Sequence, residues 1–124
     1  MSAAAIHITP VPRYLADRSS PEDEHYVFAY TITIDNQSDE TVTLISRRWL
    51  ITDANGKRIE VEGSGVVGEQ PAIAAGDDYT YTSGVSLETP VGVMEGFYTL
   101  RRDDGSEFEA PIAPFRLAQP NLIN

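Results

Sequence analysis

The sequence predicts an all-β fold, an antiparallel β-sandwich of the immunoglobulin or fibronectin type III kind with about seven strands. Apolar residues recur at every second position instead of at helical spacing. Nine glycines and eight prolines interrupt each stretch that would be long enough for several helical turns. The length of 124 residues corresponds to one domain, so we expect a single domain over 1–124, with an ordered core over 6–117 and a short C-terminal tail.

Strand signals are clearest in the first half of the chain. Large residues alternate along 26–34, which places them on one face, toward the core. The stretch 41–52 is rich in β-branched residues and holds the only tryptophan, Trp49, so we expect a central strand there. Asp53-Ala54-Asn55-Gly56 predicts a tight turn into a hairpin partner over 57–61. Further strands are predicted over 6–15 at an edge, over 78–85, and over 96–102 and 107–117 as a terminal hairpin.

Loops and turns are predicted where the alternation stops. Residues 63–76 carry four glycines and a proline, and a proline and a glycine interrupt 86–95, so both stretches are expected to be irregular. Asn36-Gln37-Ser38-Asp39 is a run of turn residues. We expect Tyr98 at a corner between strands, with its hydroxyl bound to a loop carbonyl as in immunoglobulin-like folds.

Charge and cysteine count restrict the classes of function. Nine Lys and Arg against 19 Asp and Glu give a formal charge of -10, which repels nucleic-acid phosphates and anionic lipid head groups. The absence of cysteine removes disulfides, thiol catalysis and Cys-ligated metals. No apolar run approaches the roughly 20 residues that cross a bilayer, and 1–10 lacks the features of a secretory signal. We expect a cytoplasmic protein that neither binds nucleic acid nor inserts into a membrane.

The stretch Gly63-Ser64-Gly65-Val66-Val67-Gly68 has the glycine spacing of dinucleotide-binding loops. Such a loop needs a helix directly after the third glycine, but Glu69-Gln70-Pro71 follows here and cannot begin one. The favoured interpretation is a turning loop between strands. An anion site made of backbone amides without a helix stays open as an alternative, with nucleotide or pyrophosphate as ligand.

Six of the nine positive charges occur as the doublets Arg47-Arg48, Lys57-Arg58 and Arg101-Arg102. Successive side chains of a strand point to opposite faces, so one member of each doublet points outward. On adjacent strands, Arg47, Arg48, Arg101 and Arg102 can then form an anion-binding stripe. The favoured alternative is cross-strand ion pairing with Glu60, Glu62, Glu107 and Glu109.

The sequence contains no recognisable catalytic or metal-binding constellation. Glu22-Asp23-Glu24-His25 offers oxygen and nitrogen ligands, but four consecutive residues of an extended chain cannot all face one ion. The serines lack the Gly-x-Ser-x-Gly context of a nucleophile, and the two histidines lie near the N-terminus. We therefore predict that the protein is not an enzyme and has no catalytic residues, metal ligands or cofactor.

Several short motifs follow one another in an order that is specific in combination. They are Tyr26-Val-Phe-Ala-Tyr-Thr-Ile, Arg47-Arg48-Trp49, Ile51-Thr-Asp53, Glu60-Val-Glu-Gly63, Gly65-Val-Val-Gly68-Glu-Gln-Pro71, Tyr81-Thr-Ser-Gly84, Thr89-Pro90-Val-Gly92-Val-Met94-Glu-Gly96 and Pro114-Phe115. In these motifs the chain resembles the ApaG family, also called CorD, in its bacterial stand-alone form. The resemblance extends from Ile6 to Leu117.

The resemblance implies a fibronectin type III-like sandwich without established catalytic residues. It also implies an association with cobalt resistance and magnesium efflux, and binding to a protein partner that the sequence does not identify. A nucleotide or a divalent ion is the alternative ligand. We expect the two long loops to form the recognition surface, and a purely architectural role for them stays open as the alternative. Its expected residues are Gly63, Gly65, Gly68, Gln70, Pro71, Ser83, Gly84, Thr89, Pro90, Gly92, Met94 and Gly96.

Overall fold

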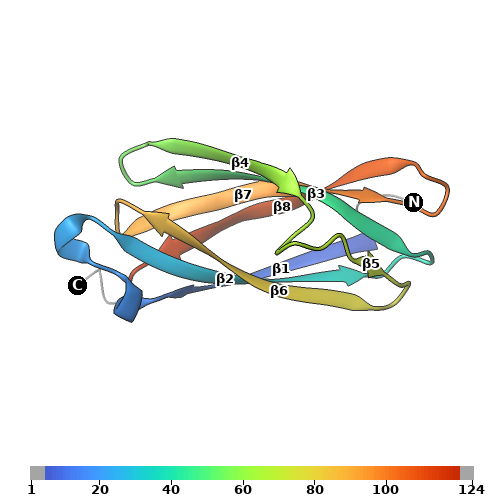
Figure 1. Cartoon of the computed structure of the whole chain (residues 1–124), viewed down its shortest axis with the longest axis horizontal. Coiled ribbons are helices and arrows are strands. Elements are labelled where there is room, and N and C mark those ends of the chain that lie inside the picture. The colour runs from blue at the N-terminus through green and yellow to red at the C-terminus, as the bar shows by residue number, and fades with distance from the viewer. Residues whose placement is uncertain (1–4, 121–124) are drawn as a thin grey trace.

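The computed structural model describes residues 5–120, which form two antiparallel sheets packed face to face (Figure 1). The first sheet has the order β1-β2-β6, with β1 at Ile6–Tyr14, β2 at Tyr26–Asn36 and β6 at Asp78–Leu87. The second has the order β4-β3-β7-β8, with β3 at Val42–Asp53, β4 at Arg58–Ser64, β7 at Val91–Arg101 and β8 at Glu107–Ala118. The short β5, Ala72–Ile73, pairs with the beginning of β3. The all-β sandwich is thus confirmed.

The core lies between the sheets and is rich in aromatic rings. Phe28, Tyr30, Ile32 and Ile34 alternate along β2 and are buried, as their spacing predicts. Trp49 of the central strand β3 meets Tyr30 of the opposite sheet, with ring centroids 5.4 Å apart. These large rings fill the space that a disulfide occupies in many immunoglobulin domains.

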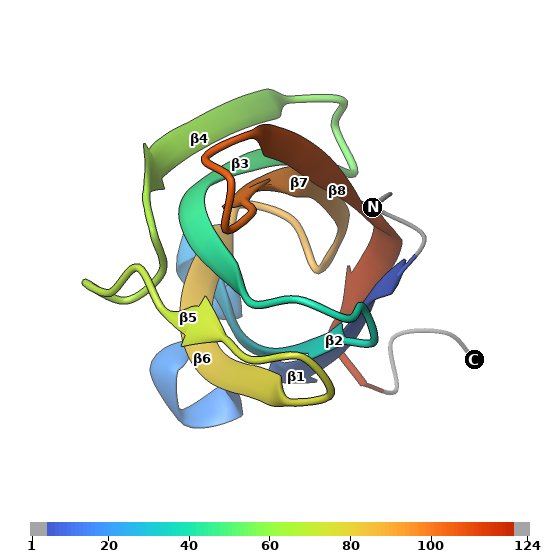
Figure 2. The ribbon, with the colours of Figure 1, turned by 90° about the vertical axis from the view of Figure 1, so that its right-hand side faces the viewer.

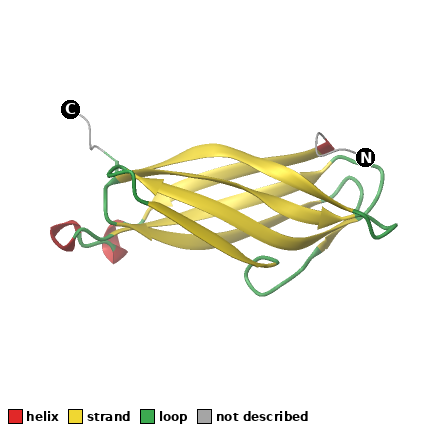
Figure 3. Ribbon diagram, turned by 90° about the horizontal axis from the view of Figure 1, so that it is seen from above, coloured by secondary structure: helices red, strands yellow, loops and turns green. Residues whose placement is uncertain are grey.

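Most connections lie at the two ends of the sandwich (Figure 3). The segment between β1 and β2 forms two short 3-10 turns, η2 at Ala16–Arg18 and η3 at Pro21–Asp23. They lie at the same end as the β3–β4 and β6–β7 turns (Figure 1). The outermost parts of the expected domain, 1–4 and 121–124, lie outside the described residues, so the expected C-terminal tail is described only to Pro120.

Two local expectations are wrong. The irregular stretch expected over 86–95 is a tight hairpin, because β6 continues to Leu87 and β7 already begins at Val91. Tyr98 does not bind a loop carbonyl. Its hydroxyl is buried and shares a hydrogen bond with the Tyr81 hydroxyl of the opposite sheet.

Candidate functional site

The connection between β4 and β5 stands out from the two sheets (Figure 2). We call residues 65–70 the finger. Its tip is a four-residue turn closed by two backbone hydrogen bonds, from Val66 N to Glu69 O at 2.8 Å and from Glu69 N to Val66 O at 2.9 Å. The central residues Val67 and Gly68 have φ angles of 43° and 83°, the combination of a type I′ turn. Val67 is 54% exposed at this tip.

The base of the finger is held to β3 and the core. Val66 is fully buried in the hydrophobic core. Gly65 N and the Gln70 side-chain amide both donate to Ile45 O, at 2.8 and 2.9 Å. The Tyr79 hydroxyl donates to Glu69 Oε2 at 3.0 Å. A buried anchor and hydrogen bonds to two strands hold the finger in one conformation.

The glycines of the finger region satisfy local packing. A Cβ on Gly65, whose φ is +56°, would lie 1.9 Å from Glu69 O. A Cβ on Gly63 would lie 2.8 Å from the guanidinium of Arg47, which donates to Ser64 O and Gly65 O. The amides of Gly65, Val66 and Glu69 donate within the chain, and no helix follows Gly68. The turning loop expected from the sequence is confirmed, and an anion site on these amides stays a prediction.

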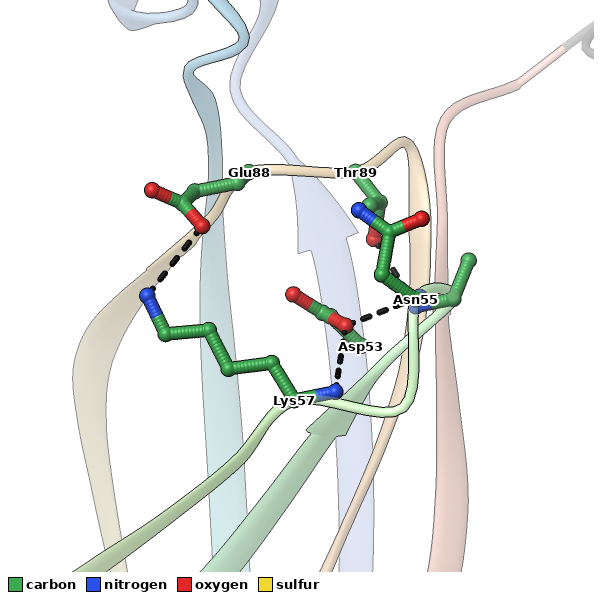
Figure 4. Close-up of polar contacts among 6 residues, drawn as sticks. Asp53, Asn55, Lys57, Glu88 and Thr89 are labelled. Atoms are coloured by element: carbon green, nitrogen blue, oxygen red, sulfur yellow. Dashed lines mark hydrogen bonds and ion pairs between the residues drawn. The ribbon is translucent and has the colours of Figure 1, made fainter.

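Thr89 joins two turns at the far end of the sandwich (Figure 4). Its buried hydroxyl accepts from Ala54 N at 3.0 Å and donates to Val91 O at 2.7 Å. In the facing turn, Asp53 Oδ1 accepts from the amides of Asn55 and Lys57, each at 2.9 Å. The Lys57 ammonium also pairs with Glu88 at 3.1 Å. The Thr89 hydroxyl, Asp53 Oδ1 and the Lys57 ammonium thus all have partners inside the chain.

The other expected recognition residues of β6 and β7 differ in exposure. Met94 is fully buried, Gly92 is buried against Leu87 and Thr52, and Gly96 lies against Arg48 O. Pro90 is half-buried in the β6–β7 turn, and Ser83 and Gly84 lie on β6 in the other sheet. Pro71 follows the finger, and its carbonyl accepts from Leu44 N at 2.9 Å.

The structure does not bring the two expected loops together. The finger begins beside Ile45 of β3, whereas Gly92 pairs with Asp53 at the other end of that strand. A strand advances about 3.3 Å per residue, so the two places are about 25 Å apart. Only the finger therefore combines exposure, a defined shape and an apolar tip. Val67 was not among the residues expected to bind, although a β-branched residue before Gly68 in so short a turn is an unusual sequence feature.

The basic doublets lie on neighbouring strands but at different positions along the strand direction. Thr43 of β3 pairs with Arg101 of β7, whereas Thr52 at the other end of β3 pairs with Arg58 of β4. Arg48 forms ion pairs with Glu60 and Glu62, and Arg101 pairs with Glu107 at 3.0 Å. Arg102 lies over the Phe108 ring, 4.2 Å from its centroid. The cross-strand pairs expected with Glu60, Glu62 and Glu107 are present, and the anion-binding stripe stays a prediction.

The acidic run 22–25 is exposed, and its first two residues, Glu22 and Asp23, lie in η3. Glu24 has a φ of 54°, and Asp23 accepts from the Ser20 hydroxyl at 2.7 Å. Over residues 5–120, no three His, Asp or Glu side chains form a group that could hold a metal ion. Within the same range, no helix is long and apolar enough to cross a bilayer.

Comparison with known families fits this architecture. The ApaG domain matches residues 16–102, which include the finger and most of both sheets. This chain belongs to the ApaG family. Protein ApaG of Vibrio vulnificus is 57% identical over 124 residues, which cover 100% of this chain and 98% of that protein. Protein ApaG of Vibrio campbellii is 61% identical over 112 residues, covering 90% of this chain and 89% of that protein.

Two solved structures share the fold over nearly the whole chain. A structural genomics target, SoR45, superposes with a TM-score of 0.93 at 48% identity, covering 98% of this chain and 92% of that one. A Bordetella pertussis protein described as ApaA superposes with a TM-score of 0.91 at 45% identity, covering 94% of each chain.

Proposed function

We propose that this protein is a non-enzymatic, cytoplasmic binding module that recognises a protein partner through the finger. The observation that carries the proposal is the exposed Val67 side chain, held at positive φ at the tip of an anchored turn. A β-branched residue is costly in that conformation, and such strain is concentrated at functional sites.

The finger also suits protein recognition by its shape. An exposed apolar side chain on a preformed turn loses little conformational entropy on binding, so its burial contributes fully to affinity. The Glu69 carboxylate, which accepts from the Tyr79 hydroxyl, places a polar group in the same turn as this apolar tip. A partner with a small apolar pocket and a polar rim fits this arrangement.

The association with cobalt resistance and magnesium efflux belongs to the same proposal. In this proposal the protein does not move ions itself. It is an adaptor that binds a protein partner, and the partner affects ion transport. In a bacterium deleted for its own ApaG protein, this chain is then expected to restore cobalt tolerance, and the chain carrying Val67→Asn is not.

The test of the finger is affinity capture with Val67→Asn. Asparagine tolerates positive φ, so we expect the variant to be at least as stable as the original while it loses the captured partner. Val11→Asn is the matched control, because Val11 is 59% exposed on β1, away from the finger. Partners are compared by mass spectrometry after capture on the immobilised protein. A partner retained by Val67→Asn and lost by Val11→Asn would contradict the proposal.

A further inference from the structure

A hollow on the outer face of the first sheet is lined by Arg13 and Arg18, whose side chains have no partner within residues 5–120. Arg13 of β1 pairs with Ala29 of β2, and Ala29 pairs with Gly84 of β6, so the three form one row across the sheet. Phe28 and Tyr30 on either side of Ala29 face the core, so this row faces outward. Ala29 and Gly84 in this row have only a methyl group and a hydrogen as side chains. The surface of the sheet is therefore recessed at this point.

The 3-10 turn η2 forms the wall of the hollow. Leu15 N donates to Val27 O at 2.8 Å. The Ser19 hydroxyl donates to Leu15 O and accepts from Val27 N, each at 2.8 Å. These bonds fix η2 against β2 and present Arg18 beside the row of Arg13. Figure 2 shows the 3-10 turns folded next to the end of β6. Together with Thr82 on the next outward row of β6, these elements enclose about 720 Å³.

Ion pairs occupy some of the basic side chains outside the hollow, whereas Arg58 and Arg116 form none within the described residues 5–120. Arg48, Lys57 and Arg101 are paired with carboxylates. By contrast, the side chains of Arg13 and Arg18 have no hydrogen bond or ion pair within residues 5–120, although Arg18 N donates to Leu15 O at 3.1 Å. Asp17 also lines the hollow but pairs with neither arginine. In a chain of net charge -10, this leaves a local excess of positive charge over a recessed floor.

We propose that this hollow binds the phosphate group of a small phosphomonoester. Guanidinium groups bind phosphate oxygens through paired, charge-assisted hydrogen bonds, and two of them neutralise a dianion. The Thr82 hydroxyl, which shares a hydrogen bond with the Thr31 hydroxyl at 2.8 Å, is a further polar group on the same rim. The recessed floor at Gly84 gives room for the esterified part of the ligand. This site is independent of the finger and of its glycine motif.

The proposal is tested by NMR titration of the amides with phenyl phosphate, with inorganic phosphate and malonate as comparison anions. We expect shifts at Ala29, Thr82 and Gly84 with phenyl phosphate below about 10 mM. The double variant Arg13→Gln/Arg18→Gln should weaken binding by about tenfold or more, since it removes both charged hydrogen-bond donors. Arg58→Gln, an exposed arginine on β4, is the matched control and should bind as the original does.

Two further variants separate binding from folding. Asp17→Asn removes the one carboxylate of the hollow and should tighten binding, a gain that unfolding cannot imitate. Gly84→Val should block the floor, and the backbone tolerates it because a Cβ there meets only Phe28 O at 3.5 Å. No shift with phenyl phosphate, equal binding by all variants, malonate binding as tight as phosphate, or shifts at Gly63–Gly68 instead would each overturn the proposal.

Discussion

Gly96 and Gly84 are both strand glycines, but only Gly96 is required by its surroundings. Gly96 lies at the β-bulge where β7 shifts register against β8, and a Cβ there would be 1.9 Å from Arg48 O. The contact is with backbone of the central strand, which cannot move without disturbing β3. Gly84 has no such contact, since its nearest atom would be 3.5 Å away. Sequence alone does not distinguish them, because the difference depends on the neighbouring strand.

We expect Gly96→Ala to lower the free energy of unfolding by about 1–3 kcal/mol or more, because overpacking forces the β3 backbone to shift. Gly84→Ala is the matched control and should change it by less than about 0.5 kcal/mol. Urea unfolding followed by tryptophan fluorescence measures both, since Trp49 is in the core. Equal costs for the two variants would contradict this explanation of Gly96.

Asn36 shows how far turn chemistry can be predicted. Its residue type correctly indicates the turn between β2 and β3. The structure adds that its side chain is fully buried and that its amide donates to Glu40 O and Ile73 O, each at 2.9 Å. The partner in β5 is distant in sequence, so no local pattern indicates this bond. Asn36 therefore joins the turn to the end of the sandwich core.

The hairpins of the chain differ in how well their sequences predict them. The sequence correctly predicts the β3–β4 turn at 53–56, because the signal is local and Gly56 adopts its φ of 82° without strain. The β6–β7 turn was missed, because Pro90 and Gly92 are ordinarily loop residues. Gly92 is instead needed inside β7, where a Cβ would lie 2.8 Å from Thr52 O. The reason for that glycine lies in the neighbouring strand, not in its own segment.

Thr89→Val tests whether the two turns support each other. Valine keeps the shape of threonine but leaves Ala54 N without its acceptor, so we expect a loss of about 1–3 kcal/mol in the free energy of unfolding. Thr82→Val, at an exposed strand position, should cost much less. Hydrogen exchange at Ala54 should also become faster in Thr89→Val. Unchanged protection at that amide would show that the Thr89 hydroxyl does not hold the turn.

The whole sandwich explains why the candidate sites were harder to predict than the strands. Alternation along one strand is enough to predict its inner face, which gave β2 and the layered core. A site depends on which strands become neighbours and on their register. Register places the finger and Thr89 at opposite ends of β3, and it places Arg13 beside Ala29 and Gly84. No local pattern in the sequence indicates that Arg13 and Arg18 share a hollow.

The bond between the Tyr81 and Tyr98 hydroxyls joins the two sheets and makes the fold sensitive to alkali. Burial raises the pKa of Tyr81 and of Tyr98 well above the ordinary tyrosine range. In the unfolded chain these side chains ionise near pH 10, so above about pH 10 the unfolded state binds fewer protons than the folded state. The contribution of the two raised tyrosine pKa values to the free energy of unfolding is complete below about pH 10. It is lost as the pH rises further, by about 1.4 kcal/mol per pH unit for each tyrosine.

We therefore expect the free energy of unfolding to fall steeply above about pH 10, the ordinary pKa of tyrosine. Urea unfolding at several pH values between about 8 and 11 measures this fall. The double variant Tyr81→Phe/Tyr98→Phe removes both hydroxyls together, so neither is left buried without a partner. Its stability at pH 8 should remain close to the original, and its decline above pH 10 should be shallower. The same slope in both proteins would mean that the tyrosine pair ionises freely in the folded state and that the two sheets separate locally before the chain unfolds.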